Sequence, residues 1–346
     1  MMAKLNYTRD ELMADHDYAK PHEEVGYKLH GGFDASGTYI SPRTLNRWPA
    51  VEAWQAALTA RDWPLIDATT QLLSRGNYPN IEQQKILLDN GLGETLWNSL
   101  TITGIIEARG QALCNFEAPD FQQIIVDDIS DTCTGHLHKG LLYAHGIDEG
   151  GDPKVPNGPG AHDQMWYAAR DLIFGAGRYP IPDVPENIGR PDQGRLMPQL
   201  PMGFESLILL LMNVLMIEVR AEAGFSFNCK LLRDKATFTG LRAEADLAAT
   251  MIERIRTDEA IHVAYLQTTV SEMRSFTFKT VDGGTVAGKD LIDPIWEGMV
   301  KWHGVTQAQL SREQSQTAIH ARIGKLENGT KVLQAFEATD DLIKAA

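Results

Sequence analysis

The chain has 346 residues, of which 43% are hydrophobic and 23% charged, so it has the composition of an ordinary soluble protein with one large or two small domains. Its 32 basic and 46 acidic residues give a net charge of −14, which argues against nucleic acid as a main partner, and no basic run suits an anionic membrane. Three cysteines without a CxxC pair exclude a disulfide framework, and the polar N-terminus lacks the apolar core of a signal peptide, so we expect a cytoplasmic protein.

The first 45 residues are rich in Gly, Pro and aromatic residues, and we expect them to form an extended arm. Two short helices are predicted at 49–62 and 64–76, since each segment begins with a proline. Longer helical patterns follow at about 81–114 and, after a turn, at about 121–145.

Residues 146 to 200 are dense in Gly and Pro, with a single short helical segment, "AHDQMWYAARDLIFG", between two loops. An insertion of this size inside a compact domain is usually a lid or a binding element, so we predict that it covers the open side of the helices. A surface insertion or an oligomer contact is the alternative.

The third and fourth long helices are predicted at about 203–225 and 241–276, followed by a small hairpin at 277–288 and a helical tail. The chain is therefore expected to be all-α, with four long helices in two antiparallel pairs. It divides into an N-terminal arm with short helices (1–80), a four-helix unit (81–276) with the insertion at 146–200, and a C-terminal hairpin and tail (277–346), forming one domain overall.

Ionisable residues lie on the apolar face of each long helix, as the helical spacing shows. The faces carry Glu107 on the first helix, Asp128, Asp131 and His138 on the second, Glu218 and Glu222 on the third, and Glu259 and His262 on the fourth. Carboxylates that converge in a core with few Lys or Arg would repel one another unless cations lie among them. Carboxylates with imidazoles suit iron or manganese, and two divalent ions would supply the missing charge.

This arrangement resembles the ferritin-like diiron-carboxylate superfamily, in which one helix of each pair provides a Glu and the other a Glu-x-x-His motif. The second pair matches with Glu222 and Glu259-Ala-Ile-His262, and the first matches with Glu107 and His138. The family would have a carboxylate at Gly135, so Asp131 is expected to replace it. Asp128 is the alternative to Asp131, or the site lacks one ligand and the space at Gly135 admits substrate or O₂.

The candidate metal ligands are therefore Glu107, Asp131, His138, Glu218, Glu222, Glu259 and His262. Glu218 either replaces Glu222 or forms a hydrogen bond to a ligand histidine. We interpret His136 as an outer or surface histidine, His162 and Asp163 as the start of a helix, and His303 as a packing residue.

The resemblance implies a ferritin-like four-helix bundle with extra N- and C-terminal helices and a Gly/Pro-rich insertion between the helix pairs. It further implies a non-haem dimetal oxygenase or oxidase that uses O₂ to oxidise a small organic substrate. The expected cofactors are two iron ions, with manganese or a mixed Mn/Fe pair as alternatives. An external electron donor or reductase is expected because no flavin or iron–sulfur motif is present. The rival interpretations are a metal-storage bundle and a helical enzyme with a single metal, and a homodimer is left open.

Overall fold

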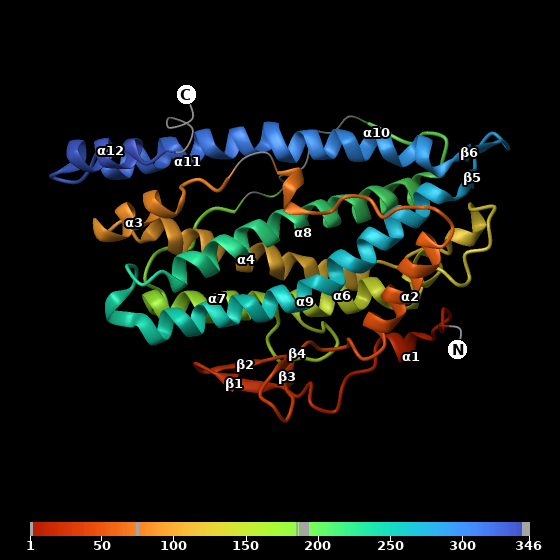
Figure 1. The fold of residues 1–346 in the computed structure, drawn as a ribbon, viewed down its shortest axis with the longest axis horizontal. Coiled ribbons are helices and arrows are strands. Elements are labelled where there is room, and N and C mark those ends of the chain that lie inside the picture. Colours follow the sequence, from red (N-terminus) through yellow and green to blue (C-terminus); the bar gives the residue numbers. More distant parts are fainter. Residues whose placement is uncertain (1–2, 74–75, 185, 187–193, 341–346) are drawn as a thin grey trace.

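The computed structural model describes residues 3–73, 76–184, 186 and 194–340. Helices dominate this part of the chain, as expected for an all-α protein (Figure 1). Its strands form three two-stranded antiparallel hairpins: β1 (His22–Glu24) with β2 (Tyr27–Leu29), β3 (Gly32–Phe33) with β4 (Tyr39–Ile40), and β5 (Thr277–Lys279) with β6 (Thr285–Ala287). The last of these confirms the hairpin predicted from the sequence, and the first two belong to the N-terminal arm.

Five helices pack against one another in the middle of the molecule: α4 (Glu94–Gly110), α6 (Leu141–Gly150), α7 (His162–Phe174), α8 (Met202–Arg233) and α9 (Arg242–Ser275). The third and fourth helices predicted from the sequence are confirmed as α8 and α9, and α8 continues to Arg233. In Figure 1, α6 and α7 follow one another along α9, and the loop between them extends toward the hairpins of the arm.

The remaining helices lie around this centre. The shorter ones before α6 are α1 (Arg9–Leu12), α2 (Arg47–Thr59), α3 (Ile81–Asp89) and α5 (Cys133–His136). The C-terminal part contains α10 (Gly288–Lys301), a π-helical turn η6 (Trp302–Thr306), α11 (Gln307–Ile323) and α12 (Gly329–Ala338). These form an outer layer, in which α10 packs against α9 and α8 and α12 packs against α3 (Figure 1).

The predicted second helix at 121–145 is wrong. The chain there forms turns and the single turn of α5, and a regular helix begins only after Gly140, whose φ of 105° ends the preceding turn. The short helix predicted within the insertion at 146–200 is confirmed as α7, but the loop predicted before it is wrong at its start, because residues up to Gly150 belong to α6. Residues 185 and 187–193 of the insertion lie outside the described chain.

The glycines of α6 explain this error. A Cβ atom at Gly146 would lie 2.8 Å from the backbone nitrogen of Cys114, and one at Gly150 would lie 2.9 Å from the carbonyl oxygen of Ala108. These glycines therefore permit close packing against the C-terminal part of α4 and the 3₁₀ turn that follows it (Gln111–Asn115), although in the sequence they look like loop residues.

Two other boundaries differ from the sequence prediction. The helix predicted at 81–114 is divided into α3 and α4 around Gly91, whose φ of 74° a helix does not allow. The helix predicted at 64–76 is reduced to a 3₁₀ turn at Thr70–Leu72, and residues 74–75 lie outside the described chain.

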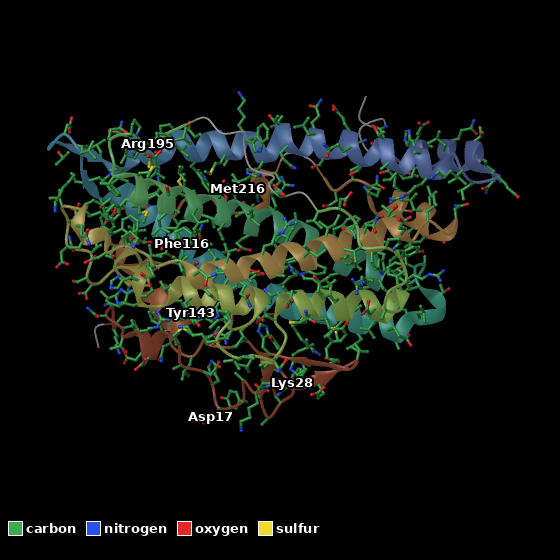
Figure 2. The ribbon with its side chains drawn as sticks, turned by 180° about the vertical axis from the view of Figure 1, so that it is seen from behind. Asp17, Lys28, Phe116, Tyr143, Arg195 and Met216 are labelled. Carbon is green, nitrogen blue, oxygen red and sulfur yellow. The ribbon has the colours of Figure 1, made fainter. Side chains whose placement is uncertain are left out.

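The apolar core consists of two large clusters, and side chains fill the space between the helices (Figure 2). Along α8, Met216 belongs to one cluster and Phe225 to the other; along α9, Ile261 and Ile255 divide in the same way. Buried polar residues occupy the junction between the two clusters, for example Glu218 on α8.

Among the described residues, α8 is the helix long and apolar enough to cross a membrane, with 56% of its most apolar window buried in the fold. A core helix of a soluble protein has the same properties, so this feature is weak evidence for a membrane span.

Candidate metal centre

Four carboxylates and three imidazoles converge at the junction of the two apolar clusters. They are Glu107 of α4, His145 and Glu149 of α6, His162 of α7, Glu218 of α8, and Glu259 and His262 of α9, and all are buried. Two groups of four can be distinguished, and within each group one potential ligand atom per residue lies within 4.8 Å of all the others. Glu149 belongs to both groups.

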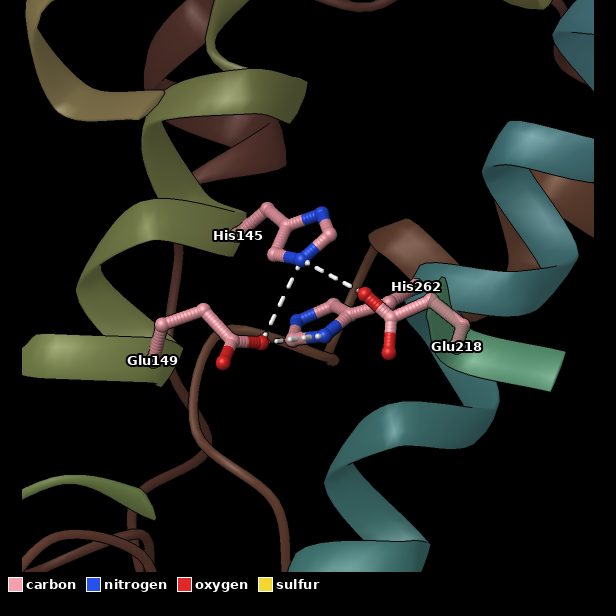
Figure 3. A group of neighbouring side chains, drawn as sticks. All are labelled: His145, Glu149, Glu218 and His262. Carbon is pink, nitrogen blue, oxygen red and sulfur yellow. Dashed lines mark ion pairs between the residues drawn. The ribbon is translucent and has the colours of Figure 1, made fainter. Parts of the chain in front are cut away.

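The first group contains His145, Glu149, Glu218 and His262 (Figure 3). Nε2 of His145 lies 3.2 Å from Oε1 of Glu149 and 3.2 Å from Oε1 of Glu218. Nδ1 of His262 lies 3.2 Å from the same oxygen of Glu149. The rings of His145 and His262 are stacked with their centroids 3.8 Å apart, so both imidazoles present a nitrogen to one small space.

The second group contains Glu107, Glu149, His162 and Glu259. Nδ1 of His162 lies 3.0 Å from Oε1 of Glu259, 3.6 Å from Oε2 of Glu107 and 3.7 Å from Oε1 of Glu149. The other oxygen of Glu259 lies 2.8 Å from Nδ1 of His262, in the first group. Glu149 and Glu259 therefore both connect the two groups.

Three polar atoms of this centre are buried without a hydrogen-bond partner in the described structure: Oε1 of Glu149, Nδ1 of His162 and Oε1 of Glu259. Nδ1 of His162 lies within ion-pair distance of both oxygens, but the directions do not suit hydrogen bonds. A buried polar atom without a partner costs about 1–3 kcal/mol. Atoms that converge on a common point without bonding each other are the donors that a cation requires, so this residue set fits a metal.

Each of the three histidines uses its second nitrogen for an outer partner. The pairs are His145 Nδ1 with the Tyr265 hydroxyl (2.8 Å), His162 Nε2 with Asp258 Oδ2 (3.3 Å), and His262 Nε2 with Asp148 Oδ2 (3.2 Å). Histidines that bind metals are usually oriented in this way, because the outer partner fixes the tautomer and the ring direction.

The N-terminal arm and the start of α2 hold the two outer aspartates. Asp258 also accepts hydrogen bonds from the Tyr39 hydroxyl at 3.0 Å and from Ser41, and its Oδ2 lies 3.1 Å from Nε2 of His30. Asp148 forms ion pairs with Arg43 and with Arg47, the latter at 2.8 Å. The predicted arm therefore covers this side of the centre and stabilises its outer layer.

Without a cation, the centre balances its charges by protonation. Burial and the nearby Glu149 raise the pKa of Glu107 well above its usual value, and burial with repulsion from Glu259 raises that of Glu218 to about 8. Burial opposes a charge on His162 and His262, but the combined attraction of Glu259 and the other nearby carboxylates outweighs it and holds the pKa of both well above the usual value. Metal ions would replace these protons, because bound imidazoles are neutral and bound carboxylates are ionised.

Four of the seven residues predicted as ligands lie in this centre: Glu107, Glu218, Glu259 and His262. Glu222 does not, because Arg256 of α9 binds its carboxylate through two nitrogens at the partly exposed side of the helix, with 2.9 Å between Nε and Oε2. Of the two glutamates considered on α8, Glu218 is the one that faces the centre.

Asp131 and His138 are also wrong as candidate ligands, because both are exposed on the irregular segment before α6. Asp131 lies near Asn6, at 3.5 Å, and Asp128 accepts a hydrogen bond from the backbone of Ser130. The space expected at Gly135 does not exist, since a Cβ atom there would lie 2.0 Å from the carbonyl oxygen of Ile129.

His136 is buried but belongs to the packing of the N-terminal arm. It accepts a hydrogen bond from the backbone N–H of Tyr7 at 3.0 Å, and its Nδ1 lies 2.7 Å from the carbonyl oxygen of Thr132. Burial lowers its pKa to about 4, so it is neutral under ordinary conditions.

The sequence interpretation missed His145 and Glu149 as ligands and assigned His162 to a helix start alone. His162 is indeed the first residue of α7, but its side chain also enters the centre. The spacing of His145 and Glu149, four residues apart on one helix face, was a usable signal, which the surrounding Gly and Pro residues obscured.

Comparison of the chain with models of protein families, with curated proteins and with solved structures finds no match. Any inference about function therefore rests on the residues and geometry of this centre.

Proposed function

We propose that this protein is a non-haem dimetal oxidoreductase that holds two iron ions and uses O₂ to oxidise a small organic substrate. The observation that carries the proposal is the pair of four-residue groups that share Glu149 and are also connected through Glu259. A carboxylate shared between two groups of ligand atoms is suited to hold two cations close together. The mixture of imidazole and carboxylate donors suits iron, and manganese is the alternative.

The first ion would be held by His145, Glu218 and His262, and the second by Glu107, His162 and Glu259, with Glu149 between them. Four ionised glutamates would balance two divalent cations, and the histidines would add neutral ligands. A reduced iron pair supplies the electrons that O₂ activation requires, and an external donor or reductase would restore them.

The order of the ligand-bearing helices supports the ferritin-like interpretation. Helix α4 provides Glu107, α8 provides Glu218, and α9 provides the Glu-x-x-His motif of Glu259 and His262. The second Glu-x-x-His motif of the ferritin-like pattern would here be divided between two helices. Glu149 lies in the last turn of α6, and His162 begins α7 after the loop at 151–161. On this proposal, the loop interrupts a helix of the bundle at the metal centre.

The surroundings favour redox chemistry over storage. The ligands lie between two apolar clusters and beneath the N-terminal arm, which limits the access of water to reactive species. The outer partners Tyr265, Asp258 and Asp148 fix the direction of each histidine, and such fixed geometry benefits a reaction more than it benefits the release of stored metal.

Anaerobic titration with Fe(II), followed by metal analysis and by O₂ consumption, tests the proposal. We expect two ions per chain and rapid O₂ consumption by the reduced protein. Glu149→Ala and His162→Ala should lose metal while circular dichroism shows that they remain folded. His138→Ala and Glu222→Ala are matched controls and should retain both ions.

The other outcomes separate the rival functions. One ion per chain would support a mononuclear enzyme, and two ions without O₂ consumption faster than that of free Fe(II) would support storage. Unchanged metal content in both Glu149→Ala and His162→Ala would overturn the assignment of the centre.

A further inference from the structure

The two groups of potential ligands differ in the number of carboxylates that belong to each group alone. Apart from the shared Glu149, the first group has one carboxylate, Glu218, and two imidazoles (Figure 3). The second group has two carboxylates, Glu107 and Glu259, and one imidazole. An ionised carboxylate brings a negative charge and a neutral imidazole brings none, so the second group attracts a divalent cation more strongly.

The outer layer of the first group carries a positive charge. Asp148 lies beside His262 of this group, with 3.2 Å between Oδ2 and Nε2. It forms ion pairs with Arg43 and Arg47, so these three side chains together carry a charge of +1. Asp15 accepts a hydrogen bond from the backbone N–H of Arg43, but it is exposed and water screens its charge. The outer layer therefore weakens the attraction of the first group for a cation.

The outer layer of the second group carries a negative charge. Asp258 is the outer partner of His162, and its other hydrogen-bond partners are His30, Tyr39 and Ser41 of the N-terminal arm. None of these has the permanent charge of Arg or Lys, and no Arg or Lys of the described residues forms an ion pair with Asp258. Asp258 is fully buried, so water does not screen its charge. The outer layers therefore favour the same group as the ligands do.

Asp258 also determines which nitrogen of His162 is available to an ion. Nδ1 of His162 lies within 3.7 Å of three carboxylate oxygens of the second group and is buried without a hydrogen bond in the described structure. Nε2 lies 3.3 Å from Oδ2 of Asp258. When Nε2 carries the ring proton and donates it to Asp258, Nδ1 keeps its lone pair for a cation.

We propose that the second group takes up a divalent cation before the first group does, and that Asp258, held by the N-terminal arm, is the positioning residue that gives the second group this preference. The tighter of the two binding steps then belongs to Glu107, Glu149, His162 and Glu259. This inference rests on the proposed function, because it assigns an order to the two ions of the same centre.

Titration of the metal-free full chain with Mn(II) tests the order, followed by calorimetry and by electron paramagnetic resonance, which distinguishes a single bound ion from a spin-coupled pair. Repulsion between the ions separates the two steps in any such pair, so matched variants decide which group is filled first. Glu107→Gln and Glu218→Gln each replace one buried carboxylate, in one group each, by an amide of the same shape. Glu107→Gln should weaken the tighter step at least about tenfold, whereas Glu218→Gln should weaken only the weaker step.

Asp258→Asn tests the positioning residue. The amide oxygen can still accept the hydrogen bond of His162, so the variant mainly removes the charge, and it should weaken the tighter step by about 10- to 100-fold without a comparable loss in the weaker step. Asp171→Asn is the matched control. Asp171 also accepts a hydrogen bond from a tyrosine of the arm, Tyr27 at 2.9 Å, but its other partner is Arg170 rather than a ligand histidine. This variant should bind both ions as wild type does.

Loss of the tighter step in Glu218→Gln rather than in Glu107→Gln, or equal losses in both, would overturn the order. Wild-type binding by Asp258→Asn, or equal weakening of both steps, would overturn the role of Asp258, because damage to the fold of the arm affects the whole centre. Consumption of O₂ by the Fe(II) protein is measured separately. A reversed order with rapid O₂ consumption would overturn this inference alone. A chain that binds one ion, and loses it in Glu107→Gln, would support this inference and overturn the dimetal function.

Discussion

Gly110→Ala is a small change that should disturb the metal centre through one contact. Gly110 ends α4, and an added Cβ atom would lie 2.6 Å from Cγ and 2.7 Å from Cβ of Glu149. Ordinary contacts begin at 3.4 Å, so the carboxylate-bearing side chain must move by about 3.4 − 2.6 = 0.8 Å. Metal ligands tolerate displacements of roughly 0.2 Å. Because Glu149 belongs to both groups, both ions should be bound more weakly.

We expect Gly110→Ala to lower the Fe(II) affinity by about 10- to 100-fold, as changes that displace a ligand commonly do. Helix propensity favours Ala by about 0.5–1 kcal/mol, so the fold itself should survive the substitution. The assay is anaerobic Fe(II) titration, with thermal melting of the metal-free protein measured in parallel.

Gly224→Ala is the matched control. Gly224 lies inside α8, and an added Cβ atom there would meet nothing within 4 Å. This variant should melt at a higher temperature and bind iron as wild type does. Wild-type iron affinity in Gly110→Ala would refute the reasoning, since the close approach of α4 to Glu149 would then have no consequence for the centre.

Three further predictions concern residues around the centre and in the core. Asp148→Asn removes the carboxylate that forms an ion pair with the buried Arg47, and it should lower the free energy of unfolding by about 3–5 kcal/mol in urea denaturation. A loss below about 1 kcal/mol would contradict this prediction. Tyr265→Phe removes the hydroxyl at 2.8 Å from Nδ1 of His145 and should reduce iron affinity at least tenfold with little change in melting temperature, so unchanged affinity would exclude an orienting role. Burial raises the pKa of Glu272 from 4.5 to about 7, so the native state binds more protons than the unfolded state between these values and loses stability as the pH rises. Relative to wild type, Glu272→Gln should therefore gain up to about 3 kcal/mol between pH 4.5 and 7; a difference that does not change with pH would refute the cause given for the shift.

The sequence alone was sufficient for the two long helices α8 and α9. Their apolar residues repeat at helical spacing over many turns, so the polar residues on the same face stand out. Glu218, Glu259 and His262 were identified in this way, and Glu107 was found on a shorter helix by the same argument. The regular spacing is a local property of the chain, which is why a sequence pattern can report it.

The choice between neighbouring candidates required the tertiary structure. Glu218 and Glu222 are one turn apart, and only the position of Arg256 on α9 decides which of them is paired at the surface. The same is true of His136 and His138, since the segment before α6 buries His136 and leaves His138 exposed.

The remaining half of the centre depends on contacts between distant segments. Gly146 and Gly150 belong to a helix because α6 packs closely against the end of α4, and no local signal distinguishes such glycines from those of a loop. Glu149 and His162 are 13 positions apart in the sequence, yet the loop at 151–161 brings them into one group. Local periodicity therefore determined which long helices carry ligands. The close packing of α4, α6 and α7 decided which side chains complete the centre, because that packing depends on the volumes of side chains that are distant in the sequence.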